Sequence, residues 1–176
     1  SSIIAGNYSV TITDVNNCTF ATATTITQPN ALTTTVSTTP ASCNGGTDGS
    51  VDLTVNGGTS SYTFAWSNGE TTEDLNNIAA GTYQVTVTDA NNCTSTIIAN
   101  VNTPSGLVLN YTTTEINCNG DTNGAININP TGGTPAYTFA WSNGETTEDL
   151  NGLGANTYTI TLTDANNCSI TSTITL

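Results

Sequence analysis

The sequence predicts an all-β protein made of tandem β-sandwich repeats, and three observations lead to this prediction. Thr, Val, Ile and Tyr, which favour strands, recur between clusters of Asn, Gly and Asp, which favour turns. Landmark residues such as Trp66 and Trp141 return at a spacing of 75 residues. Apolar Tyr83, Val85 and Val87 alternate with polar neighbours, as in a strand with one buried face. We therefore expect antiparallel sandwiches with a period of 75 residues in an extended array.

Exact repetition sets the boundaries of these repeats. The segment TFAWSNGETTEDLN at residues 63–76 returns unchanged at residues 138–151. Pro29 and Pro104 stand at corresponding places, where proline ends a strand and stiffens a short linker. Residues near the start have the Gly, Tyr, Val, Asp and Cys spacing of the end of a repeat, so we expect the array to extend upstream of Ser1. The expected regions are the C-terminal part of a preceding repeat, residues 1–30, and two full sandwich repeats, residues 31–105 and 106–176.

Within the repeat that begins at Ala31, we expect a turn at Gly57-Gly58 and another at residues 89–92. Asn68-Gly69 predicts a type I′ hairpin turn, because Asn-Gly readily adopts positive φ values. The strands expected from these turns lie near residues 32–42, 50–55, 62–66, 82–88 and 93–101, with a variable stretch through Leu75.

The aromatic residues refine the fold class. Gly81-Thr82-Tyr83 resembles the tyrosine corner of immunoglobulin-like (Ig-like) sandwiches, and Trp66 stands on the third strand, where such sandwiches place a central core ring. We therefore expect Ig-like modules of seven strands or a similar number. The predicted core aromatics of the two repeats are Trp66, Tyr83, Trp141 and Tyr158.

The charge balance excludes several classes of function. The 176 residues include 13 Asp and Glu but no Lys, Arg or His, which gives a formal charge of -13. Nucleic-acid binding needs basic side chains, and His-dependent zinc sites and Ser/His/Asp triads need histidine. Catalysis would depend on carboxylates alone, and no pair of them stands out, so we expect no catalytic residues and no enzyme. No apolar stretch approaches the roughly 18 residues of a membrane helix, so we expect no membrane insertion.

Two long segments resemble a known repeat family. CNGGTDGSVDLTVNGGTSSYTFAWSNGETT, residues 43–72, and CNGDTNGAININPTGGTPAYTFAWSNGETT, residues 118–147, are similar to SprB repeats. SprB repeats occur in tandem in very large cell-surface adhesins of Bacteroidetes, including the gliding-motility adhesin, which the type IX secretion system exports. The resemblance implies an extracellular stalk or filament at the cell surface, and it indicates no particular ligand.

The acidic residues raise the question of a metal site. Calcium binds six to eight oxygen ligands, and a chain without cations gains from a hard cation that relieves carboxylate repulsion. NGGTDG in the first repeat becomes NGDTNG in the second, which moves the carboxylate but keeps an oxygen at the matching place. The alternative is a solvated acidic face, with no cofactor. The candidate calcium ligands are Asp48, Asp89, Asp121 and Asp164.

The five cysteines are disulfide candidates, since the array has the character of a secreted protein. In an Ig-like strand order, Cys43 and Cys93 lie at opposite ends of one sandwich, separated by about 23 Å of strand. A disulfide needs Cα atoms within about 7 Å. Head-to-tail stacking brings Cys43 close to Cys168 of the next repeat, so we favour this pair. The open alternatives are pairing within a repeat, Cys43 with Cys93 and Cys118 with Cys168, and pairing across a linker, Cys18 with Cys43 and Cys93 with Cys118.

These observations favour a structural function, in which repeats form an extended extracellular stalk or filament of an adhesin and contact neighbouring repeats of the same chain. One alternative is a set of binding modules that recognise a glycan or surface polysaccharide through avidity. Another is a self-assembling fibre, in which Thr-rich strand edges without Lys pair with other chains.

Overall fold

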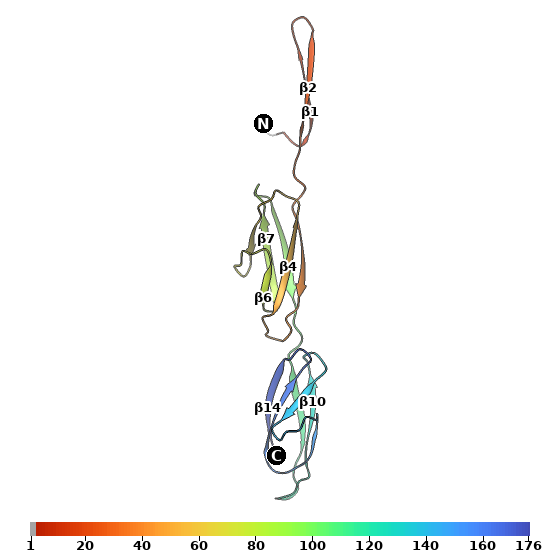
Figure 1. The fold of residues 1–176 in the computed structure, drawn as a ribbon, viewed down its shortest axis with the longest axis vertical. Coiled ribbons are helices and arrows are strands. Elements are labelled where there is room, and N and C mark those ends of the chain that lie inside the picture. Colours follow the sequence, from red (N-terminus) through yellow and green to blue (C-terminus); the bar gives the residue numbers. More distant parts are fainter. Residues whose placement is uncertain (1–2) are drawn as a thin grey trace.

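The protein is an elongated array of a hairpin and two β-sandwiches placed end to end (Figure 1). A computed structural model describes residues 3–176. The described residues form strands, turns and short linkers without a helix, and so include no helix that could cross a membrane. The extended array and the all-β class agree with the sequence prediction.

The N-terminal hairpin consists of β1 (Gly6–Thr13) and β2 (Thr19–Ile26), paired antiparallel along their whole length. Within residues 3–176 it pairs with no further strand. Its apolar side chains are therefore open to solvent, with Val10 52% exposed and Ile12 60% exposed. Val85 and Val87, which stand one period later, are both 0% exposed because a second sheet covers them.

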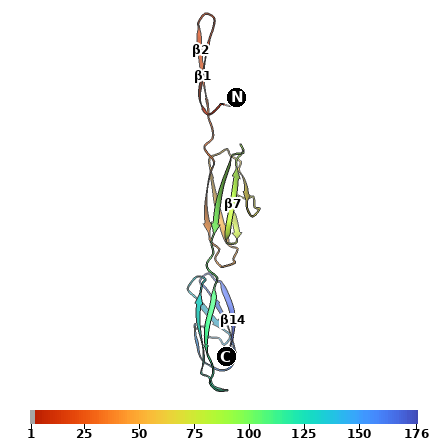
Figure 2. The same ribbon diagram turned by 180° about the vertical axis from the view of Figure 1, so that it is seen from behind.

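The first sandwich contains two three-stranded antiparallel sheets (Figure 2). Alternating burial along its central strands confirms the predicted pattern of one buried and one wet face. One sheet has the order β3 (Thr33–Thr39), β4 (Gly49–Asn56), β6 (Leu75–Ile78). The other has the order β5 (Thr63–Trp66), β7 (Gly81–Thr88), β8 (Thr94–Val101).

The second sandwich repeats this arrangement with the same strand order. Its register differs little, and a bulge recurs at the start of the second strand in both repeats. The strands are β9 (Val108–Thr114), β10 (Gly124–Thr131), β11 (Thr138–Trp141), β12 (Leu150–Leu153), β13 (Thr157–Thr163) and β14 (Ser169–Thr175).

Each sandwich has its own core around one tryptophan. Trp66 and Trp141 are each 5% exposed and lie in separate hydrophobic clusters. The Trp66 Nε1–H donates to the Thr72 carbonyl at 2.9 Å, so its polar atom is satisfied although the ring is buried. Tyr158 is buried, whereas Tyr83 is half-buried and packs against the core.

The tyrosine corner is present in both repeats. The Tyr83 hydroxyl donates to the carbonyl of Ala79 at 2.9 Å, and Tyr158 does the same to Gly154 at 3.0 Å. Both bonds return to the backbone four residues upstream, as the corner of an Ig-like sandwich does. The two modules therefore have the Ig-like architecture that the sequence predicted.

Each module has six strands, which agrees with the predicted seven or a similar number. One sequence prediction needs correction. The predicted type I′ turn at Asn68-Gly69 is wrong, since Gly69 has a positive φ of 90° but Asn68 does not. The Gly69 N–H donates to the Trp66 carbonyl, and the Trp66 N–H donates to the Glu70 carbonyl. The chain makes this different turn because β5 pairs with β7, and the segment after Glu70 crosses to the opposite sheet to form β6.

Candidate functional site at the junction of the two repeats

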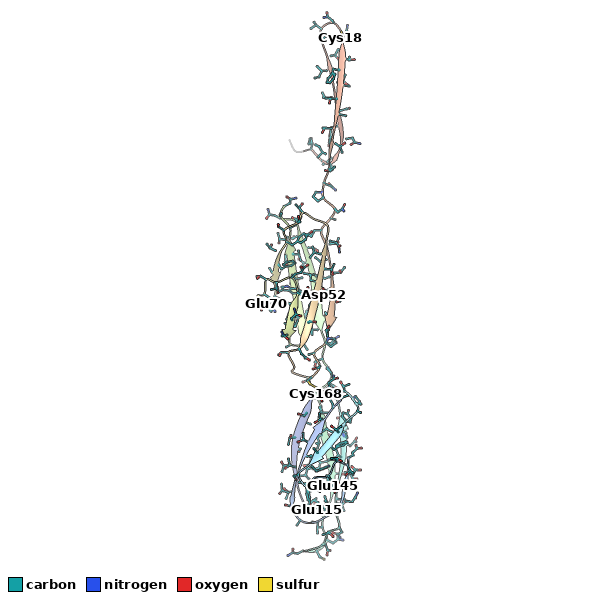
Figure 3. All side chains as sticks on the ribbon, viewed as in Figure 1. Cys18, Asp52, Glu70, Glu115, Glu145 and Cys168 are labelled. Carbon is teal, nitrogen blue, oxygen red and sulfur yellow. A yellow bond between two sulfur atoms is a disulfide. The ribbon has the colours of Figure 1, made fainter. Side chains whose placement is uncertain are left out.

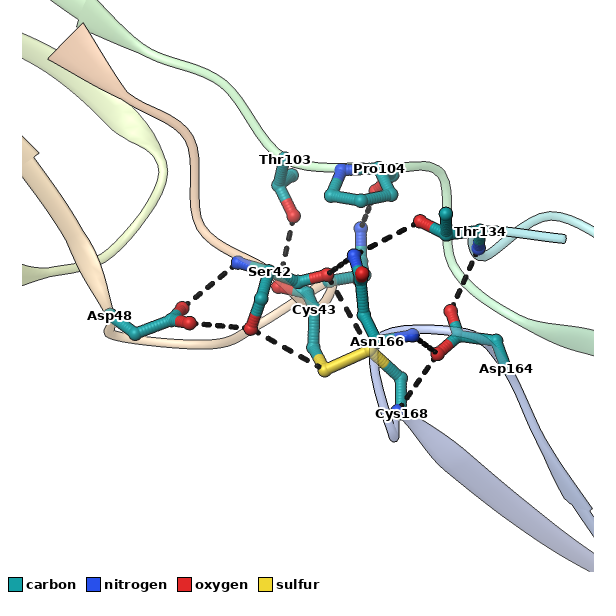
Figure 4. Close-up of a disulfide and its surroundings, with 10 residues drawn as sticks. Ser42, Cys43, Asp48, Thr103, Pro104, Thr134, Asp164, Asn166 and Cys168 are labelled. Atoms are coloured by element: carbon teal, nitrogen blue, oxygen red, sulfur yellow. Dashed lines mark hydrogen bonds between the residues drawn. A yellow bond between two sulfur atoms is a disulfide. The ribbon is translucent and has the colours of Figure 1, made fainter. Parts of the chain in front are cut away.

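The two sandwiches meet at a covalent junction (Figure 4). Cys43 lies in the turn between β3 and β4, which we call the A–B turn, residues 40–48. Cys168 lies in the turn between β13 and β14, which we call the F–G turn, residues 164–168. A disulfide joins them with a Cα–Cα distance of 5.6 Å, which lies within the usual range. This is the pairing that head-to-tail stacking favoured.

Asp48 holds the A–B turn in shape. Its carboxylate accepts hydrogen bonds from both the backbone N–H and the hydroxyl of Ser42, the residue before Cys43. The Ser42 hydroxyl, together with the Ser42 N–H, lowers the pKa of Asp48 below its ordinary value, because both donors stabilise the ionised form. The turn is closed by the Gly46 N–H, which donates to the Cys43 carbonyl at 2.9 Å.

Asp164 does the same for the F–G turn. Its Oδ1 accepts from the N–H groups of Asn166 and Cys168, both at 2.9 Å. Its Oδ2 accepts from the Thr134 N–H at 2.8 Å, which ties this turn to the neighbouring one. The Thr134 donor is the largest cause of a lowered Asp164 pKa, and the other two donors add to it, whereas burial acts in the opposite direction.

Direct hydrogen bonds cross the junction beside the disulfide. The Asn166 side-chain amide donates to the Ser42 carbonyl at 2.9 Å, from one sandwich to the other. The same amide donates to the Thr134 hydroxyl at 3.1 Å, which fixes its orientation. The interface therefore has a directional polar contact as well as a covalent bond.

The linker between the sandwiches is bound on both sides. Thr103 donates its hydroxyl hydrogen to the Cys43 carbonyl at 2.9 Å, and Asn44 donates to the Pro104 carbonyl at 3.3 Å. On the other side, the Gly133 N–H donates to the Ser105 carbonyl at 2.8 Å. A linker held in this way restricts the hinge motion that free linkers allow.

The four candidate calcium ligands occupy separate places. Asp48 and Asp164 hold the two turns of the junction, and Asp89 holds the corresponding F–G turn of the first sandwich. Asn123 takes the place of Asp48 in the second repeat, where it accepts from the Asn117 N–H at 3.2 Å, and Asp121 lies two residues earlier. No cluster of three or more metal-binding side chains occurs in the described part of the chain. In the structure, the carboxylates of Asp48, Asp89 and Asp164 accept hydrogen bonds that shape turns.

Sequence reasoning missed the polar groups that cross the junction. Ser42, Asn44, Thr103 and Asn166 look like ordinary turn residues in a chain rich in Ser, Thr and Asn. For the aspartates, the sequence does contain a pattern that predicts their role in turns. Asp followed by Asn at the second and Cys at the fourth position afterwards is an Asx-turn pattern, in which the carboxylate accepts backbone N–H groups. That pattern recurs at Asp14, Asp89 and Asp164.

Solved structures resemble the chain at low identity. One is the C-terminal 282-residue fragment of intimin in complex with the intimin-binding domain of its translocated receptor, with 16% identity and a TM-score of 0.41. That match covers 83% of this chain and 64% of the intimin fragment. Another is the set of extracellular domains 3–5 of Drosophila OTK, with 12% identity, a TM-score of 0.33, and coverage of 99% of this chain and 72% of that one. No curated protein sequence matches the chain.

The family comparison identifies the repeats themselves. A family model described as SprB repeat matches residues 35–71 and residues 103–146. Each match includes the A–B turn and the strand that carries the core tryptophan, β5 in one repeat and β11 in the other. The ends of the two regions are 75 residues apart, which is the period seen in the sequence. The chain therefore contains two regions that match the SprB repeat model, one over each sandwich.

Proposed function

We propose that this chain is part of an extracellular stalk in a cell-surface adhesin, in which each Ig-like repeat is locked to the next. The observation that supports this function best is the junction, where a disulfide, a hydrogen bond between sandwiches and a bound linker act together. A set of binding modules that worked only by avidity would need reach but not rigid coupling. A stalk that transmits force needs both.

The aromatic side chains favour the stalk over glycan binding. Trp66 and Trp141, the side chains best suited to stack on a sugar, are buried in the two cores. Among residues 3–176, the exposed aromatic side chains are Phe20 and Tyr111, which lie in different parts of the array. Neither repeat presents an aromatic platform on its surface.

The charge distribution is consistent with a solvated shaft. Acidic side chains such as Asp52, Glu70, Glu115 and Glu145 are spread along the outside of both sandwiches (Figure 3). Because the chain has no cation, these surfaces repel one another between neighbouring copies and oppose lateral association. This argues against the self-assembling fibre.

Small-angle scattering tests the proposal in solution. The parent chain is compared with the Cys43→Ser/Cys168→Ser variant, which lacks only the Cys43–Cys168 disulfide, called the staple below. A stalk predicts a rod to which each sandwich adds roughly 35–45 Å, since about eight residues of strand plus turns set its length. Removal of the staple should broaden the distance distribution by permitting bending. A compact globule, or saturable binding to a panel of surface polysaccharides, would count against the stalk.

A further inference from the structure

Three cysteines remain outside the disulfide, and each lies in a turn equivalent to one of the two turns that form the junction. Cys18, Cys93 and Cys118 are free thiols and are exposed. Cys93 and Cys18 lie in F–G-type turns, at the positions that Cys168 holds one and two periods later. Cys118 lies in the A–B turn of the second sandwich, at the position that Cys43 holds one period earlier. By comparison with the formed disulfide, Cys18 and Cys93 therefore belong to the F–G side of a junction, and Cys118 belongs to the A–B side.

The F–G turn of the first sandwich already has the geometry of the formed junction. Asp89 accepts from the N–H groups of Asn91, Cys93 and Thr59, each at 2.8 Å. The Asn91 amide donates to the Thr59 hydroxyl at 2.7 Å, as Asn166 does to Thr134. Asn166 makes one additional bond, to the Ser42 carbonyl of the preceding sandwich. Asn91 is aligned for the same bond.

A pocket lies beside Cys93, between the F–G turn and the linker. Its lining includes Ala31, Leu32 and Cys93. One period later, Gly106, Leu107 and Cys168 line the corresponding pocket, and there Asn44 from the preceding sandwich forms part of the wall. Asn44 packs over Gly106, since a Cβ placed on that glycine would lie 3.7 Å from the Asn44 side chain. By analogy with the formed junction, the segment that fits the pocket at Cys93 is therefore an A–B turn with an asparagine in the place of Asn44.

We propose that Cys93 and this pocket form the seat for a Cys-Asn-Gly A–B turn of the repeat that precedes residues 31–105 in an array. Cys118 supplies the same turn to the F–G seat of the repeat that follows. This inference rests on the proposed stalk function and extends it, because it makes every junction a stapled one and assigns each free thiol its partner.

A stapled array of this kind contains two covalent tracks. Residues 18–43 and 93–118 each hold the last strand of one repeat, a linker and the first strand of the next. Disulfides connect such segments end to end into two continuous tracks. At each junction, one track continues through the linker and the other continues through the disulfide. Within the first sandwich the tracks run side by side, since Thr34 on β3 and Ser95 on β8 are hydrogen-bonded at 3.0 Å. Residues 44–92, with the other four strands, lie outside both tracks.

Thiol exchange on the intact chain tests the seat. The probe is a peptide with the sequence of residues 41–49, ASCNGGTDG, supplied as its mixed disulfide with glutathione. The Cys93 thiolate attacks the peptide sulfur, a new protein–peptide disulfide forms, and glutathione leaves as a thiolate that takes up a proton. Attack on the other sulfur gives a glutathione adduct, so the ratio of the two adducts at equilibrium reports the affinity of the seat for the peptide. Glutathione disulfide alone supplies the baseline for each thiol.

The three free thiols serve as controls for one another. We expect the peptide-to-glutathione ratio at Cys93 to exceed that at Cys118 by about fivefold, which corresponds to one net hydrogen bond. Cys18, whose hairpin has the same turn but pairs with no further strand within residues 3–176, should resemble Cys118. The Asn91→Ala variant, or a peptide with Asn44→Ala, should lower the ratio at Cys93 toward the baseline. Mapping needs a Glu- or Asp-directed protease, because the chain has no Lys or Arg.

Equal ratios at all three thiols would overturn the seat, while the rod measured by scattering would still support the stalk. The other contradicting result is a disulfide between Cys93 of one copy and Cys118 of another, formed by the chain alone under the same conditions. The A–B turn that occupies the seat would then belong to a second copy of the chain and not to the preceding repeat of the same array.

Discussion

Cys43 and Cys168 are separated by 125 residues in the sequence, yet their Cα atoms lie 5.6 Å apart across the junction. The disulfide connects the A–B turn, which follows β3, to the last residue before β14. A covalent route therefore runs down β3, through the disulfide and down β14, along the length of both sandwiches (Figure 1). Under tension this route shields the enclosed residues, including most of both cores, from the applied force.

Removal of a core tryptophan should destabilise one repeat strongly. Trp66→Ala leaves a large cavity and should lower the free energy of unfolding by about 3–5 kcal/mol. Trp66→Phe keeps most of the ring volume and loses the bond to Thr72, so it should cost less. Urea denaturation followed by the fluorescence of Trp141 and by circular dichroism separates the two repeats. A Trp66→Ala variant as stable as the parent would contradict the core assignment.

The turn that binds the linker should tolerate only glycine. Gly132 has a φ of +74°, and a Cβ there would lie 1.9 Å from the Gly106 carbonyl oxygen. Gly144, with a φ of +92° and nothing within 4 Å of a Cβ, is a matched control. Gly144→Ala should cost about 1–2 kcal/mol from backbone conformation alone. Gly132→Ala should cost clearly more, as measured by thermal denaturation, and equal losses would contradict the close approach.

Acid should destabilise the F–G turns. The hydrogen bond from Thr59, together with those from Cys93 and Asn91, lowers the pKa of Asp89 below its ordinary value of 3.8, and Asp164 behaves in the same way. A carboxyl with a lowered pKa binds fewer protons in the folded state, so its stabilisation is complete above pH 3.8 and is lost as the pH falls through the lower, folded-state pKa. Melting curves between pH 6 and pH 2 should show this decline.

The control for the acid effect is a neutral side chain at the same place. Asp89→Asn should lower the melting temperature near neutral pH and weaken its dependence on pH, because an amide nitrogen cannot accept the Thr59 or Cys93 N–H. The same change at the exposed Asp52 should alter neither. A parent whose stability stayed constant below pH 4 would show that these hydrogen bonds are not maintained in solution.

Ions should stabilise the chain by screening rather than by specific binding. With a formal charge of -13 and no cation, the carboxylates repel one another, and salt weakens that repulsion. The melting temperature should rise by the same amount in sodium chloride and in calcium chloride at equal ionic strength. Saturable calcium binding that sodium cannot reproduce would restore Asp48, Asp89, Asp121 and Asp164 as candidate ligands.

Much of the fold could be predicted because periodicity and alternation are local properties of the sequence. The spacing of Trp66 and Trp141 gave the repeat, and the alternation around Val85 gave the buried face of β7. The turn at Asn68 was predicted incorrectly because its type depends on which sheet the next strand joins. That choice is a tertiary property.

The site was harder to predict because its two halves come from different repeats. Spacing alone left three pairings open for Cys43, and only the relative placement of the sandwich ends distinguishes them. From the sequence, the aspartates fitted either calcium ligands or a solvated acidic face. In the folded chain, the oxygens of Asp89 and Asp164 accept backbone N–H groups of the turns that present Cys93 and Cys168, a role that depends on the turn geometry.

Single-molecule pulling from both ends of the chain tests the central claim, that the Cys43–Cys168 staple carries tension between the repeats. Complete unfolding under reducing conditions should release more contour length than unfolding of the oxidised chain, by roughly 410–450 Å for the 125 residues between the two cysteines. The Cys43→Ser variant should behave like the reduced chain in both conditions. A difference of only about 170 Å would indicate pairing of Cys43 with Cys93 inside one repeat. That result, or equal lengths in both conditions, would contradict the staple.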